Sequence, residues 1–174
     1  MVRHTLKSLG PKVLATRMVR EYVERLYTPS AETSRALDHD YAGAKQLGEW
    51  KQRVRAGWPS VAIDHVESSG VSDAPELGAT LEVRVFASLG DLEPDDVDVQ
   101  VVYGRIRHEE DLVDTAVESL VLAETYEAGR HRFEARVALS QTGPFGYTAR
   151  ILPKHPMLAS PAELGCIAVP HEHI

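Results

Sequence analysis

Three short stretches of the sequence carry residue types that could do chemistry. The acidic stretch 93–98 (EPDDVD) offers carboxylates to calcium, but it lacks the ligand spacing and central glycine of an EF-hand, so we interpret it as a solvated turn entering a strand. His171 and His173 flank Glu172 at the chain end, where chains fray, so we interpret this possible metal pair as an incidental tail. Gly143–Tyr147 (GPFGY) is either a turn running into a strand or an aromatic contact for a sugar.

No spacing in the sequence assembles an active site. It holds no G-x-S-x-G elbow, phosphate-binding loop, G-x-G-x-x-G or H-E-x-x-H. Cys166 is the single cysteine, which excludes an internal disulfide and a Cys-rich zinc site, and we interpret it as a small buried apolar residue. His108–Asp111 is interpreted as a polar hairpin connection, and the scattered histidines neither indicate nor exclude a spatial triad. We therefore expect no catalytic, cofactor-binding or metal-binding residue.

The charge changes sign along the chain. Residues 1–58 hold 11 Lys and Arg against 6 Asp and Glu, a net charge of +5, whereas residues 59–174 hold 8 against 20, a net charge of −12. The change falls at Trp58-Pro59, where the proline disfavours helix for the residue before it. A length of 174 residues allows two small domains, so we predict a helical segment over 1–59 and a second domain over 60–174.

The first segment has the period of amphipathic helices. Val2, Leu6 and Leu9 predict a short helix that ends at Gly10-Pro11. A second helix begins near Thr16 and ends at Thr28-Pro29, with an apolar stripe made of Met18, Val19, Tyr22, Val23 and Leu26. Ser30 is expected to cap a third, long helix over 31–57. These helices are too few to bury their apolar faces against one another.

The second segment alternates apolar and polar residues with the period of strands. The clearest runs are 80–88, 97–103, 131–139 and 145–152, with weaker ones at 61–66 and 120–126. Turn residues separate these six strands, and no helix lies between them. The predicted fold class is therefore α+β, with N-terminal amphipathic helices followed by an antiparallel, immunoglobulin-like β-sandwich.

The residues also bear on whether the chain binds DNA or a membrane. The basic helices before Pro29 have the outline of a helix-turn-helix reader of DNA, but the acidic remainder of the chain would repel phosphate. The sequence has no run of 18 apolar residues and no apolar h-region near Met1. We therefore expect a cytoplasmic protein with no nucleic-acid and no membrane partner.

The first 29 residues resemble the segment that closes the catalytic core of glycogen and α-glucan phosphorylases. That segment ends in a helix of the type x-R-M-V-x-x-Y-x-x-x-x-Y-x-P, and the matching positions here are Arg17, Met18, Val19, Tyr22, Tyr27 and Pro29. The remainder resembles the C-terminal extension of bacterial α-glucan phosphorylases, best in 83–92, 99–105, 143–147 and 152–165.

The resemblance implies an enzyme that releases glucose 1-phosphate from α-1,4-glucans by phosphorolysis, with pyridoxal phosphate on a lysine in a motif like E-A-S-G-T-S-N-M-K. That motif is absent, and none of the lysines has a matching context: Lys7, Lys12, Lys45, Lys51 and Lys154. We expect a non-catalytic C-terminal part of such an enzyme, either a separate product or a fragment, with no cofactor of its own.

The expected partners are the missing phosphorylase core or a second copy, bound through the N-terminal helices, and an α-glucan. A free-standing β-sandwich module that binds glucan or a protein is the alternative, and a helix-turn-helix binder is a further one.

Overall fold

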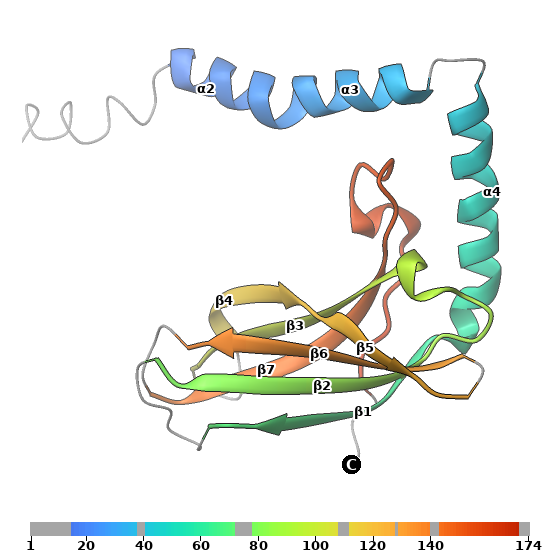
Figure 1. Ribbon diagram of the computed structural model, residues 1–174. Coiled ribbons are helices and arrows are strands. Elements are labelled where there is room, and N and C mark those ends of the chain that lie inside the picture. The colour runs from blue at the N-terminus through green and yellow to red at the C-terminus, as the bar shows by residue number, and fades with distance from the viewer. Residues whose placement is uncertain are drawn as a thin grey trace, which may run out of the picture. The chain divides into compact units, whose positions relative to one another are not determined.

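The computed structural model of the chain describes residues 15–37, 41–71, 78–107, 112–127, 129–139 and 143–170 (Figure 1). Helices come first and antiparallel sheets follow, so the fold is α+β as predicted. The chain divides into two compact units, one up to Glu49 and one from Trp50 onward. The predicted helix at Val2–Leu9, the connection His108–Asp111 and the tail His171–His173 lie outside the described residues.

The first described helix continues through its proline. α2 (Ala15–Tyr22) runs into a π-helical turn, η2 (Val23–Tyr27), and then into α3 (Thr28–Leu37), so the predicted helix end at Thr28-Pro29 is wrong. A proline inside an α-helix lacks its N–H and crowds the carbonyl four residues back. The π turn widens the helix just before Pro29, and the N–H of Thr28 donates to the carbonyl of Val23, five residues back.

The predicted long helix over 31–57 is two helices. α3 ends at Leu37, and α4 begins at Ala42 and ends at Gly57. Tyr41, just before α4, has a φ of 54°, a left-handed conformation that a right-handed helix cannot contain. Ser30 lies inside α3 and does not cap a helix. The predicted end at Gly57 is confirmed, and Pro59 sits in the 3₁₀ turn η3 (Trp58–Ser60) that follows.

The part of the chain that the structure describes contains two antiparallel sheets. The first has the order β1-β2-β6-β5 and the second the order β4-β3-β7. The strands are β1 (Ala62–Ser69), β2 (Thr80–Ser88), β3 (Val97–Ile106), β4 (Leu112–Ser119), β5 (Val121–Thr125), β6 (Arg130–Ala138) and β7 (Phe145–Pro153). In Figure 1 the β1-β2-β6-β5 sheet lies in front of β3 and β7, and β1 contacts β7 at one side of the pair.

The predicted alternation places the core between these sheets. The inward side chains of β2, β3, β6 and β7 are buried, among them Leu81, Val83, Val85, Val97, Val99, Val101, Phe133, Val137, Ala149 and Ile151. Their neighbours in sequence point to the opposite faces of the sheets. The pattern read from the sequence is therefore confirmed for the four best-defined strands.

The strand that the sequence analysis missed is β4. Its sequence, LVDTAVES, does not alternate, and its last six residues are exposed. Asp114, the third residue of β4, has a φ of 51°, which interrupts regular strand geometry. An edge strand with so little burial leaves no period-two signal to find. The predicted number of six strands is therefore one too low for the described residues.

Candidate functional site

The acidic stretch 93–98 forms a turn and the start of a strand. Its first half forms the 3₁₀ turn η4 (Pro94–Asp96), and β3 begins at Val97. Asp96 is only 7% exposed, so the interpretation as a fully solvated turn is wrong for this residue. Among the residues that the structure describes, no group of three or more His, Cys, Asp or Glu side chains could hold a metal.

Asp96 instead joins the end of α4 to the sheets. Trp50 Nε1 donates to Asp96 Oδ1 at 2.7 Å, and Arg53 donates to both carboxylate oxygens at 2.6 and 2.8 Å. The backbone N–H of Glu93 donates to Oδ2 at 3.0 Å and closes a capping box over η4. We call Trp50, Arg53 and Asp96 the α4 anchor. It satisfies both carboxylate oxygens of a buried charge with donors from two elements.

The α4 anchor sets the ionisation of its own members. Burial, the largest single influence on Asp96, favours the neutral acid, but hydrogen bonds from Arg53, Trp50 and Glu93 outweigh it and keep the pKa of Asp96 below its ordinary value. The hydrogen bond with Asp96 raises the pKa of Arg53. Asp96 is therefore a charged structural group near neutral pH, and it has no proton to transfer.

A second set of contacts extends the α4 anchor toward the C-terminal segment. Lys51 pairs with Glu163 of the 3₁₀ turn η6 (Pro161–Leu164), and this hydrogen bond lowers the pKa of Glu163. The ring of His155 lies 4.7 Å from the ring of Trp50. Val54, on the same helix, is fully buried. The C-terminal half of α4 is thus an integral part of the unit that contains the sheets.

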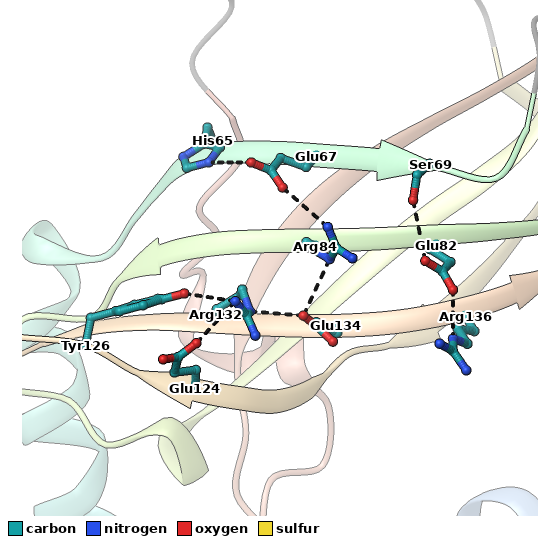
Figure 2. Close-up of polar contacts among 10 residues, drawn as sticks. All are labelled: His65, Glu67, Ser69, Glu82, Arg84, Glu124, Tyr126, Arg132, Glu134 and Arg136. Atoms are coloured by element: carbon teal, nitrogen blue, oxygen red, sulfur yellow. Dashed lines mark hydrogen bonds and ion pairs between the residues drawn. The ribbon is translucent and has the colours of Figure 1, made fainter.

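Figure 2 shows that the outer face of the β1-β2-β6-β5 sheet carries charges that pair across neighbouring strands. Glu67 on β1 and Glu134 on β6 both contact Arg84 on β2, at 3.8 and 3.5 Å. Arg132 on β6 joins Glu134 at 3.0 Å and Glu124 on β5 at 3.2 Å. These pairs are largely exposed, where each contributes little stability. This face therefore carries exposed charges of both signs that pair with one another across the strands.

A cluster of three aromatic rings lies next to these charged pairs. His65 stacks on Phe86 with 4.1 Å between ring centres, and Tyr126 lies 6.3 Å beyond Phe86. The Tyr126 hydroxyl accepts a hydrogen bond from Arg132. The stacked rings cover one another's faces, so they do not form a flat platform for a ligand.

The apolar stripe predicted for the second helix is exposed. Met18, Val19, Tyr22, Val23, Leu26 and Tyr27 are 44–66% exposed, and neither α2 nor η2 buries any residue. Six large apolar residues on one helical segment exceed the scattered exposure that is ordinary for a protein surface. We call these six residues the α2 face.

A groove of about 930 Å³ lies along β1 and β7, which are edge strands of the two sheets. Its lining includes the consecutive residues 62–66 of β1 and 145–149 of β7. Successive side chains of a strand point to opposite faces, so a consecutive lining means that the strand edges themselves border the groove. Phe145 and Tyr147 of GPFGY belong to this lining, and the sugar contact suggested for them stays a prediction.

The remaining sequence candidates are structural. Cys166 is half-buried, and burial raises the pKa of its thiol, which keeps it protonated and unreactive near neutral pH. His131 is buried on β6, where burial lowers its pKa, and its Nδ1 lies 3.1 Å from the Thr125 hydroxyl.

Sequence reasoning missed the α4 anchor, because Asp96 lies 43 residues from Arg53 and 46 residues from Trp50. Across the described residues, no helix is long and apolar enough to span a membrane.

Comparison with known proteins decides the family. Residues 58–171 match the glycogen phosphorylase C-terminal domain. The chain belongs to this family. The glycogen phosphorylases of Mycobacterium tuberculosis and Mycobacterium bovis are each 41% identical over 170 residues, which is 97% of the chain. The maltodextrin phosphorylase of Thermococcus litoralis is 27% identical over 105 residues, 60% of the chain and 12% of that relative. No solved structure matches the chain.

The phosphorylase resemblance read from the sequence is thus confirmed. The chain spans about a fifth of the length of the mycobacterial glycogen phosphorylases. Its residues 58–171 correspond to the C-terminal domain of these enzymes.

Proposed function

We propose that this chain serves as the C-terminal part of an α-glucan phosphorylase whose catalytic portion releases glucose 1-phosphate from α-1,4-glucans. The observation that carries the proposal is the match of 97% of the chain to relatives named glycogen phosphorylase, of which it spans only 20%. The catalytic portion would supply the chemistry and the pyridoxal phosphate. This chain would supply a folded module and a surface that joins it to that portion, within the cytoplasm.

The described lysines do not fit a pyridoxal phosphate site. Lys51 is held by Glu163, and Lys45 and Lys154 are exposed on the surface. We therefore propose that this chain holds no pyridoxal phosphate of its own. Incubation of the purified chain with pyridoxal phosphate, followed by gel filtration, should leave no Schiff-base absorbance on the protein.

The α2 face is the surface proposed to contact the catalytic portion. Six exposed apolar side chains favour burial against a partner, because each contributes about 25 cal/mol per Å² of apolar area removed from water. The relatives have about four-fifths of their length outside the part that this chain matches, and that remainder is the proposed occupant. Self-association through the same face is the alternative.

An immunoglobulin-like assignment of the sheets is part of the proposal. Its support is the antiparallel order β1-β2-β6-β5 over β4-β3-β7, in which the chain passes between the sheets after β2, β4 and β6. The segment after β7 approaches the position of a further strand, because Ala168 pairs with Ile151. This arrangement follows the Greek-key connectivity of such sandwiches.

The experiment mixes the full chain with a mycobacterial glycogen phosphorylase truncated to remove its matched C-terminal part. We expect the two to co-elute on gel filtration and to separate when the chain carries Leu26→Glu, which places a charge in the α2 face. Arg20→Gln changes the net charge by the same amount on the same helix outside that face, and it should leave the complex intact. Co-elution that ignores Leu26→Glu, or no complex at all, would contradict the proposed role of the α2 face.

A further inference from the structure

Arg150 on β7 is a half-buried arginine whose charge has no carboxylate partner among the described residues. In that part of the chain only Arg132 and Arg150 are half-buried arginines, and the other arginines are exposed. Arg132 pairs with the carboxylates of Glu124 and Glu134 (Figure 2). A charge that is partly removed from water favours an opposite charge beside it. Arg150 therefore lacks the anion that the comparable arginine has.

A neutral amide holds the Arg150 guanidinium in place. Arg150 lies opposite Gln100 on β3. Their strand neighbours Val99 and Ile151 are buried between the sheets, so Gln100 and Arg150 lie on the outer face. Arg150 Nε donates to Gln100 Oε1 at 2.9 Å, and Gln100 Nε2 donates to Asp98 Oδ2 at 2.6 Å. The two terminal Nη groups remain for a ligand, and they form a fork that matches both oxygens of a carboxylate.

Arg150 lines a pocket of about 480 Å³, which we call the Arg150 pocket. One side of the pocket is the outer face of β3 and β7, and the other side is the segment 160–167, which includes η6. Ala168 pairs with Ile151, which brings this segment back alongside β7. Among the described residues that line the pocket, Arg150 is the only charged one. A cavity of this size with a few polar groups in an apolar lining is typical of small-molecule sites.

The Arg150 pocket favours a singly charged anion with an apolar body. Leu152, Pro161 and Ile167 offer apolar surface to such a body. Residues 59–174, with 8 Lys and Arg against 20 Asp and Glu, have a net charge of −12, which repels a phosphate dianion more strongly than a carboxylate. We infer that the pocket binds a small aliphatic carboxylic acid, whose carboxylate accepts hydrogen bonds from both Nη groups of Arg150 while its body lies against Leu152 and Ile167.

This binding site is independent of the role proposed above for the chain. The Arg150 pocket belongs to the unit that begins at Trp50, whereas the α2 face belongs to the other unit. Loss of complex formation through the α2 face would leave acid binding unchanged. Each proposal therefore fails or stands on its own measurement.

The test titrates the full chain with isocaproate, a branched aliphatic acid, and follows the backbone amide signals by NMR. We expect saturable shifts at Leu152, Cys166 and Ile167, with a dissociation constant in the millimolar range that is ordinary for so small a ligand. Isocaproamide has the same body without the charge, and it should bind at least about tenfold more weakly because it cannot form charge-assisted hydrogen bonds with Arg150. Inorganic phosphate should also bind more weakly than isocaproate.

Two variants remove the anion site in different ways. Arg150→Gln deletes the charge and should weaken isocaproate binding by about tenfold or more. Ile167→Glu keeps Arg150 but adds a carboxylate to the lining, which should compete for the guanidinium and abolish binding; Ile167 is 54% exposed, so the fold tolerates the change. Arg105→Gln is the matched control, because it deletes the same charge from an exposed position of β3 outside the pocket, and it should bind as the wild type does. Melting curves check that each variant is folded.

Four results would overturn the inference. They are the absence of saturable shifts, equal affinities for isocaproate and isocaproamide, an unchanged affinity in Arg150→Gln, and tighter binding of phosphate than of isocaproate. If no acid binds and Arg150→Gln dissociates the complex with the truncated glycogen phosphorylase, the guanidinium pairs with a carboxylate of that protein instead, and the small-molecule site is refuted.

Discussion

Substitution of Asp96 by alanine tests whether the α4 anchor stabilises the unit that begins at Trp50. The change leaves the buried indole N–H of Trp50 without its acceptor, at about 1–3 kcal/mol, and removes the cap on the Glu93 N–H, at about 1 kcal/mol. Half of the Arg53 side chain is exposed, so loss of its ion pair adds only about 0.5 kcal/mol. The free energy of unfolding should fall by roughly 3–4 kcal/mol.

Thermal melts followed by circular dichroism measure this effect. A loss of roughly 3–4 kcal/mol lowers the midpoint by about 10 °C in a chain of this size. The matched control is Asp95→Ala, which removes a neighbouring carboxylate that is exposed, and it should change the unfolding free energy by less than about 0.5 kcal/mol. Equal midpoints for the two variants would refute the reasoning, since the burial and hydrogen bonds of Asp96 would then contribute nothing measurable.

Three further predictions concern pH, chain length and packing. The pKa values of His131 and Asp96 are both lowered in the folded chain, so as the pH falls the unfolded chain takes up these protons at a higher pH than the folded chain does. The free energy of unfolding, measured in denaturant titrations, should therefore fall below about pH 6.5 and again below about pH 4. His131→Gln should flatten the first decline. A chain starting at Trp50 should melt above one starting at Ser60, because the shorter chain lacks the buried Val54 and both α4 donors to Asp96; equal midpoints would contradict this. Gly104→Ala should cost about 1–3 kcal/mol and speed amide exchange in β4, because its Cβ would lie 2.6 Å from the Val113 carbonyl oxygen. Unchanged exchange would show that β4 accommodates the methyl group.

The parts of the fold that the sequence predicts are those with local signals. Along β3 the buried residues Val97, Val99 and Val101 alternate with residues on the other face. This period of two is visible in the sequence because one face of the strand is buried. The helix end at Gly57 is likewise marked by the residues next to it. The weaker alternation over 120–126 coincides with the register shift at Leu122/Glu124 in β5.

The parts that the sequence does not predict depend on distant partners or on two competing local rules. Asp96 lies in an acidic turn, and nothing near it shows that Trp50 and Arg53 bury and bind its carboxylate. Pro29 is a strong signal for a helix end, but a π turn accommodates it. Neither face of β4 is buried, so apolar and polar residues do not alternate along it. The α2 face was visible in the sequence because its apolar residues recur at helical spacing.

The long separation between the members of the α4 anchor has a consequence for the order of folding. Trp50 and Arg53 pair with Asp96, which lies 46 and 43 positions later, and the neighbouring Lys51 pairs with Glu163, 112 positions later. Closing loops of this size delays contact formation, so we expect β2, β6, β3 and β7 to associate before α4 docks. Substitutions in the α4 anchor should then accelerate unfolding more than they slow refolding. We therefore expect the docking of α4 to set the lifetime of the folded module, with Val54 left uncovered until α4 docks.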